Sequence, residues 1–202
     1  VRYDGRAVRI VVGMSGSSGS VYGIRLLETL SQIPDVETEL VMSPAAELNI
    51  REETAWDPAK VQQLATRVHD WTDVGATISS GSYKTDGMVV APCSANSLAG
   101  IAYGINSNNL LLRAADVTLK ERRRLIIVFR ETPLHRGHIK AMLEATENGA
   151  ILMPPVPSFY HHPKSIDEII NHTVARTLDL LGVEHNLSRR WAGLNTMLGS
   201  ET

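Results

Sequence analysis

The chain has 202 residues, of which 43% are hydrophobic and 21% charged, the composition of a globular protein large enough to bury a sizeable core. Its net charge of −2 does not favour binding to nucleic acids or membrane surfaces. The single cysteine, Cys93, excludes an intrachain disulfide, fits a reducing compartment, and leads us to expect a cytoplasmic protein. Because the sequence starts at Val1 rather than Met, a removed upstream targeting segment stays open as an alternative.

Strand and helix patterns alternate along the chain. Runs of aliphatic residues predict strands, and apolar residues three and four positions apart predict helices. In chain order these are strand 8–12, helix 20–31, strand 36–42, helix 58–68, strand 87–91, strand 125–129, helix 133–148, strand 150–153 and a helix that opens with the capping box 165–168. This order predicts one α/β domain over residues 1–202, with a tail from about 183 and a mostly parallel sheet flanked by helices.

A glycine- and serine-rich loop follows the first predicted strand. Residues 13–19 read Gly-Met-Ser-Gly-Ser-Ser-Gly, and a helix is predicted directly after them. Glycines let the backbone approach a ligand closely, and the N–H groups of a helix start suit a phosphate. The spacing is neither the dinucleotide fingerprint nor the P-loop. It therefore predicts a phosphate site without naming the ligand, and a tight turn with a purely structural role is the alternative.

The residues that follow the other predicted strands carry hydroxyls and one Arg-Glu pair. Ligands of parallel α/β sheets bind beyond the carboxyl ends of the strands, so these residues predict a rim suited to phosphate, although each serine alone is typical of a helix cap. The second strand ends in Ser43, not in a carboxylate that would hold a dinucleotide ribose, which favours a mononucleotide. Glu131 is placed for proton transfer and Arg130 for an anion, or the two form a surface ion pair.

The other reactive side chains do not favour a metal site or a catalytic thiol. His135 and His138 lie three residues apart on a predicted helix, but no third metal ligand is near them in the sequence. Cys93 is expected to be a small buried residue rather than a nucleophile. The first loop is not the G-x-S-x-G elbow of hydrolases, which disfavours a serine esterase.

Seven strings of the sequence resemble the UbiX/Pad family of flavin prenyltransferases. They are residues 13–27, 78–82, 91–94, 113–116, 119–122, 130–133 and 154–160. The resemblance runs from about residue 8 to 191 and implies a three-layer, flavodoxin/Rossmann-like subunit that binds FMN. It also implies transfer of the dimethylallyl group of dimethylallyl phosphate to N5 and C6 of reduced FMN. The product, prenylated FMN, would serve a UbiD-type decarboxylase, and members of the family are usually homododecamers with sites between subunits.

The resemblance also implies roles for individual residues. The flavin contacts would be Gly16, Ser17, Ser18, Ser43, Ser94, Ala95, Asn96, Ser97 and Arg130. The prenyl-phosphate contacts would be Tyr160 and Arg176, with Arg113 and Lys120 from a neighbouring subunit and Trp191 at the edge of the site. Glu131 would be the catalytic acid/base, Glu53 would lie near the prenyl phosphate, and Ser18 would touch both flavin and phosphate. Such cations and donors can stabilise a phosphate leaving group without Mg²⁺, so no metal is expected.

Three positions depart from the usual residues of the family. Ser17 stands in place of alanine, Pro44 in place of the lysine that usually follows Ser43, and the pair Ala95-Asn96 in place of Met-Lys. The last two changes remove positive charge near the expected flavin.

Two other functions stay open at this point. One is a non-catalytic, FMN-binding small subunit of an aromatic acid decarboxylase complex, against which the intact Glu131, Arg176 and Lys120 argue. The other is an FMN-dependent decarboxylase of cysteine-type substrates. Such enzymes tend to carry a catalytic histidine soon after the first helix, and none lies between Ser31 and His69 here.

Overall fold

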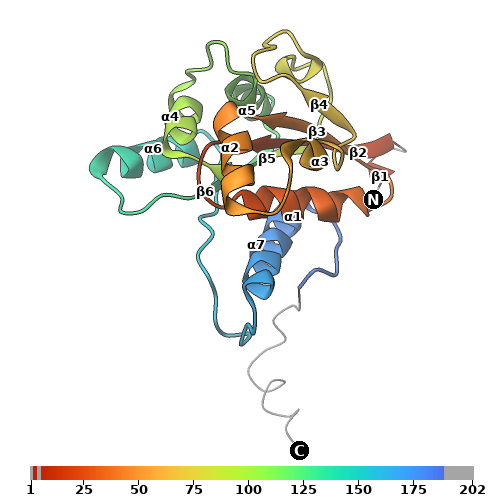
Figure 1. Cartoon of the computed structure of the whole chain (residues 1–202). Coiled ribbons are helices and arrows are strands. Elements are labelled where there is room, and N and C mark those ends of the chain that lie inside the picture. Colours follow the sequence, from red (N-terminus) through yellow and green to blue (C-terminus); the bar gives the residue numbers. More distant parts are fainter. Residues whose placement is uncertain (1, 4–5, 189–202) are drawn as a thin grey trace, which may run out of the picture.

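A parallel sheet forms the centre of the molecule, as seen in the computed structural model, which describes residues 2–3 and 6–188 (Figure 1). The strands are β1 Arg2–Tyr3, β2 Arg6–Met14, β3 Val36–Met42, β4 Arg67–His69, β5 Gly87–Cys93, β6 Arg124–Phe129 and β7 Ile151–Leu152. Six of them run parallel in the order β4-β3-β2-β5-β6-β7, and β1 pairs antiparallel with β2. The prediction of a mostly parallel α/β sheet is therefore confirmed.

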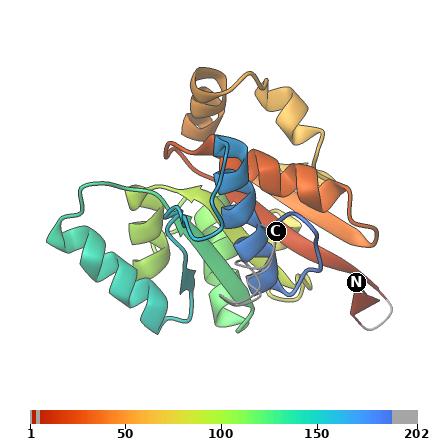
Figure 2. The same cartoon turned by 90° about the horizontal axis from the view of Figure 1, so that it is seen from below.

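Helices cover both faces of the sheet (Figures 1 and 2). They are α1 Ser20–Ser31, α2 Pro44–Glu53, α3 Pro58–Gln62, α4 Ala95–Tyr103, α5 Leu110–Lys120, α6 Arg136–Glu147 and α7 Ile166–Leu181, with a short 3₁₀ turn at Thr77–Ser79. Helices α1 and α7 pack on one face, and α4, α5 and α6 pack on the other. Every residue of β5 is buried, as expected for a strand covered on both sides. Among the described residues, no helix is long and apolar enough to cross a bilayer.

The five predicted strands and the helix at 20–31 are present, but the predicted helix at 58–68 is confirmed only over 58–62, and its second half is wrong. Helix α3 ends at Gln62, and the three residues of β4 pair in parallel with β3. Thr38 and Thr66 fix this register, because the hydroxyl of each accepts the N–H of the other at 3.0 Å. The pairing partner, about 30 residues away in sequence, overrides the local helical pattern.

Helix boundaries differ from the prediction where side chains cap them. Helix α6 begins at Arg136, not at Pro133, because the Nδ1 of His135 accepts the N–H of Gly137 at 2.9 Å. Helix α7 begins after Ser165, as predicted. Helices α2, α4 and α5 were not predicted, although each begins at a serine or asparagine whose side chain caps the first turn.

The strand order reverses between β2 and β5. β2 pairs with β3 on one side and with β5 on the other, so the connections that follow β2 and β5 leave to opposite faces of the sheet. In open α/β sheets a ligand crevice forms at this point, beyond the carboxyl ends. The Gly/Ser loop after β2 and the start of α4 after β5 therefore face each other at the expected binding edge.

Candidate functional site

Ser15 joins the loops after β2 and β5, a role not predicted from the sequence. Its hydroxyl donates to the carbonyl of Pro92 at 3.1 Å and accepts the N–H of Ser94 at 2.8 Å. Ser15 is only 2% exposed, so water does not compete for these bonds. The sequence near Ser15 gave only one hint of this role, which is that Ser15 is a third hydroxyl in the glycine loop. The hydrogen-bond partners of Ser15 lie more than 75 residues away. We call the edge that these loops form, residues 15–20, 43–46, 94–97 and 130–131, the rim.

Ser17 connects the same loop to the end of β6. Its hydroxyl donates to the carbonyl of Arg130 at 2.6 Å, and the N–H of Arg130 donates to the carbonyl of Cys93 at 3.1 Å. Ser17 is buried, so its departure from the usual alanine adds a hydrogen bond inside the rim. These bonds place the Gly/Ser loop, the end of β5 and the pair Arg130-Glu131 next to one another.

Two predicted flavin contacts are also helix caps. The hydroxyl of Ser43 accepts the N–H of Ala46 at 3.1 Å, and that of Ser94 accepts the N–H of Ser97 at 3.2 Å. A helix start leaves its first N–H groups without intrahelical partners, and in α4 these include the N–H groups of Ala95 and Asn96. The start of α4 can therefore donate to an anion while Ser94 keeps its capping role.

Gly16 lets the Gly/Ser loop pack closely against the start of α2. A Cβ atom built on Gly16 would lie 2.4 Å from the Cβ of Ala45 at the start of α2. No side chain fits there, so only a glycine lets the loop pack this closely on the start of α2. A mononucleotide phosphate fits this combination of close backbone, hydroxyls and helix-start N–H groups.

Glu53 brings a carboxylate to the start of α1 from the end of α2. It accepts the N–H of Gly19 at 2.9 Å and that of Ser20 at 3.0 Å. Burial acts to raise the pKa of Glu53, but the bonds from Gly19 and Ser20, with the hydroxyl of Ser18, outweigh it and hold the pKa below its usual value. The helix start that was expected to take a phosphate therefore already holds an anion, and the expected position of Glu53 near the prenyl phosphate stays a prediction.

Replacing Glu53 with Gln is expected to lower the free energy of unfolding by about 0.5 kcal/mol at pH 7, because a charge at a helix start is lost from an exposed position. The folded-state pKa lies below the unfolded one, so this stabilisation is present above about pH 5 and disappears as the pH falls through the folded pKa. Urea unfolding from pH 7 to pH 3 measures the difference between the two proteins. The matched control is Glu52→Gln at an exposed neighbour, and a difference that persisted at pH 3 would contradict the capping role.

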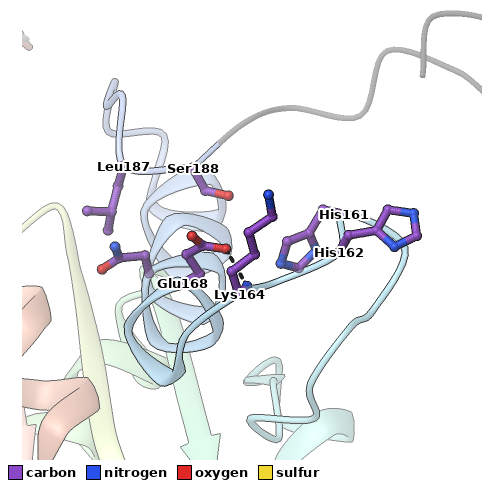
Figure 3. Close-up of a pocket in the computed structure, with 7 residues that line it drawn as sticks. His161, His162, Lys164, Glu168, Leu187 and Ser188 are labelled. Carbon is purple, nitrogen blue, oxygen red and sulfur yellow. Dashed lines mark hydrogen bonds between the residues drawn. The ribbon is translucent and has the colours of Figure 1, made fainter. Parts of the chain in front are cut away.

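Tyr160 and Arg176 lie on the α1/α7 side of the sheet. The Tyr160 hydroxyl is 3.1 Å from Nε2 of His172, and Arg176 pairs with Asp179 at 2.7 Å along α7. The loop of Tyr160 continues into a cavity of about 360 Å³ at the start of α7 (Figure 3). That cavity is lined by His161, His162, Lys164, Glu168, Asn171, Leu187 and Ser188, none of which belongs to the rim.

Arg113 and Lys120 are not brought to the rim of their own chain. Both lie on α5, where Arg113 pairs with Asp116 at 3.0 Å and Lys120 with Glu121 at 2.5 Å. Lys120 ends α5 just before β6 begins, which places it at the amino edge of the sheet. Their contribution to the site of another subunit stays a prediction. Trp191 lies outside the described residues.

His135, His138 and Cys93 are the residues considered for metal and thiol chemistry. The rings of His135 and His138 stack with centroids 3.6 Å apart, and residues 2–3 and 6–188 contain no group of three side chains arranged to hold a metal. Cys93 is fully buried, and burial raises the pKa of its thiol, so it stays protonated at neutral pH. The expectation of a buried, unreactive cysteine agrees with this environment.

A rim of hydroxyls and helix-start N–H groups at the switch point of a parallel sheet is typical of nucleotide-binding α/β proteins, and the fold is of the flavodoxin-like class. The family model described as Flavoprotein matches residues 1–178. The chain is 54% identical to the flavin prenyltransferase UbiX of Thauera aromatica, over 92% of this chain and 95% of that protein.

Two crystal structures have the same fold. One is a UbiX protein in complex with FMN and dimethylallyl pyrophosphate, with a TM-score of 0.90 and 47% identity over 93% of this chain and 99% of that one. The other is a dodecameric, FMN-dependent UbiX-like decarboxylase from Escherichia coli O157:H7, with a TM-score of 0.90 and 47% identity over 92% and 100% of the two chains. The chain therefore belongs to the UbiX flavin prenyltransferases of the flavoprotein family, and the resemblance drawn from its sequence is confirmed.

Proposed function

We propose that this protein is a flavin prenyltransferase that joins the dimethylallyl group of dimethylallyl phosphate to N5 and C6 of reduced FMN. The observation that carries the proposal is the bond from Ser17 to the Arg130 carbonyl. This bond joins the loop that is expected to bind phosphate to the residue that precedes Glu131, the group expected to transfer the proton. Relatives about half identical over most of the chain support the same activity.

The residues of the rim fit FMN. The start of α4 and the hydroxyl of Ser18 would hold its phosphate. Ser17, which donates to the Arg130 carbonyl, and Gly16, which packs against Ala45, would shape the loop beside it. Arg130 would provide a positive charge at the flavin. When bound, reduced FMN supplies the nucleophilic N5 and C6 positions.

The substrate-side residues stabilise the leaving group. Breaking the allylic C–O bond leaves charge on the phosphate oxygen, and monophosphate is a poor leaving group unless donors and cations are already in place. Tyr160 and Arg176 would donate to it from the α7 side, and Arg113 and Lys120 would add cations from a neighbouring subunit. Bond formation at C6 releases a proton, which Glu131 would accept.

The oligomer and the partner follow from the same proposal. We expect a homododecamer, as described for the relative from Escherichia coli O157:H7, in which α5 of one subunit completes the site of the next. Ile139 and Leu143, 57% and 56% exposed on α6, give each subunit an apolar surface for such assembly. The product would pass to a UbiD-type decarboxylase, and the single buried cysteine is compatible with the cytoplasm.

The activity is tested by incubating the protein with reduced FMN and dimethylallyl phosphate without oxygen and measuring the mass of the released flavin. We expect the flavin to gain one five-carbon unit. Flavin of unchanged mass would exclude the prenyltransferase and leave a non-catalytic flavin carrier. Adding the product to a UbiD-type apo-decarboxylase then tests delivery, because only prenylated FMN should restore decarboxylation.

A further inference from the structure

Both hydrogen-bond donors of Ser17 are used inside the protein. Its hydroxyl donates to the carbonyl oxygen of Arg130 at 2.6 Å, and its N–H donates to the carbonyl oxygen of Ser15 at 2.8 Å. The hydroxyl bond has one possible direction, because a carbonyl oxygen can only accept. Since Ser17 is 7% exposed, water competes little for its hydroxyl. Ser17 lies in the glycine loop, but its own donors are not available to a phosphate.

The carbonyl that Ser17 holds belongs to the peptide unit that joins Arg130 to Glu131. A peptide unit is planar, so a bond to its oxygen also restrains its N–H and the Cα of Glu131. The preceding peptide unit is held as well, since the N–H of Arg130 donates to the carbonyl of Cys93 at 3.1 Å. One bond from the loop and one from β5 therefore restrain the backbone on both sides of Arg130, and with it the direction in which Glu131 leaves the chain.

The glycine loop is a firm support for this contact. Ser15, two residues before Ser17, is buried, and its hydroxyl is bonded to two backbone groups at the end of β5. The side chain of Glu131 is oriented in turn, because its carboxylate accepts the N–H of Thr132 at 3.0 Å. Each connection from β5 to the carboxylate is therefore a hydrogen bond or a planar peptide unit.

We propose that Ser17 is a positioning residue that holds the Arg130–Glu131 peptide unit, and through it the Glu131 carboxylate, and that it does not donate to the FMN phosphate. This inference rests on the proposed function, in which Glu131 accepts the proton released from C6. Ser17 acts through the backbone and has no contact with the reacting atoms. A base that is held in one direction before the substrate binds does not have to be ordered during proton transfer. This role differs from the flavin contact that the resemblance implied for Ser17.

The variant Ser17→Ala removes the hydroxyl and leaves the backbone of the loop in place. We expect the rate of prenyl transfer at saturating substrates to fall about tenfold, because small displacements of a reacting group lower a rate strongly. The Kd for FMN should change less than about twofold. An unchanged rate would overturn the proposal, and so would a Kd for FMN raised about tenfold, which would make Ser17 a phosphate contact.

The matched control is Ser31→Ala, at the far end of α1. It also removes a serine hydroxyl that donates to a backbone carbonyl, that of Glu28 at 2.8 Å. Because Ser31 is remote from the rim, both the rate and the Kd for FMN should stay as in the unchanged protein. A loss in Ser31→Ala equal to that in Ser17→Ala would overturn the proposal, since the effect would then not depend on the place of the hydroxyl.

A double-mutant cycle tests whether Ser17 acts through Glu131. In a Glu131→Gln background the carboxylate that Ser17 positions is absent, so Ser17→Ala should slow the residual transfer less than about twofold. A tenfold loss in both backgrounds would show that Ser17 acts independently of Glu131 and would overturn the proposal.

Amide hydrogen exchange of the flavin-free protein gives a readout that does not depend on activity. In Ser17→Ala the amides of residues 130–132 should exchange at least about fivefold faster, because the loop no longer holds their peptide units. The amides of Ser94 and Ser97, which accept no support from Ser17, should not change, since they donate to the hydroxyls of Ser15 and Ser94. Unchanged exchange at residues 130–132 would overturn the positioning role even if prenyl transfer is normal. Faster exchange there in a protein that transfers no prenyl group would overturn the proposed function and leave the structural assignment of Ser17 intact.

Discussion

Replacing Glu131 with Gln is expected to lower the rate of prenyl transfer at least about a hundredfold while FMN still binds. General acid–base groups contribute roughly 10²- to 10⁴-fold to a rate, and Gln cannot accept the proton that leaves C6. Its amide has nearly the same size as the carboxyl group, so the loop after β6 should keep its shape. Single-turnover formation of prenylated flavin, followed by mass spectrometry, measures the rate.

Flavin binding separates a chemical role of Glu131 from a structural one. The carboxylate of Glu131 accepts the N–H of Thr132 at 3.0 Å, a bond that the Gln oxygen can also accept. We therefore expect the Kd for FMN to change less than about threefold, which corresponds to less than about 0.7 kcal/mol. Glu147→Gln, at the exposed end of α6, is the matched control. Loss of bound flavin in Glu131→Gln would make the residue structural, and unchanged turnover would remove it from catalysis.

Replacing Gly23 with Ala is expected to lower the free energy of unfolding by about 2 kcal/mol, the largest stability effect that we predict. A Cβ at Gly23 would lie 2.3 Å from the carbonyl oxygen of Ala91 in β5 and 2.8 Å from Cε of Met14. The methionine can move, but the carbonyl is part of the central sheet. Overpacking of this kind costs about 1–3 kcal/mol or more, which exceeds the roughly 1 kcal/mol that alanine adds to a helix interior.

The same substitution tests how α1 is docked. Gly23 lets α1 lie directly on β5, which holds the start of the helix against the rim. Urea unfolding of Gly23→Ala should show a lower midpoint, and FMN affinity should fall with it. Gly75→Ala is the control, because a Cβ there would meet only Asp73 at 3.4 Å, and its effect should stay within about 0.5 kcal/mol. Equal stability of the two variants would contradict the close approach of α1 to β5.

The sequence was sufficient for the features that local patterns encode. The buried strands β2, β5 and β6 each show an apolar run, because both faces of the sheet are covered by helices, whereas the apolar run of β3 is confined to its last three residues. Helix α1 has the predicted bounds because both of its signals are local. Its apolar spacing lies within the helix, and the glycine loop directly precedes it. Motifs such as residues 13–27 and 130–133 also identified the family before any contact was known.

Tertiary structure decided the features that depend on partners distant in sequence. Strand β4 exists because β3 pairs with it, and Glu53 caps α1 from 33 and 34 residues away. Ser15 and Ser17 could have been ordinary turn residues, and only folding brings Pro92 and Arg130 to their hydroxyls. A single sequence records which side chains can donate or accept a hydrogen bond, but the packing of the sheet and helices selects their partners. The glycine loop therefore predicted a phosphate site from sequence alone, whereas the hydrogen bond that joins this loop to the residue before Glu131 was visible only in the fold.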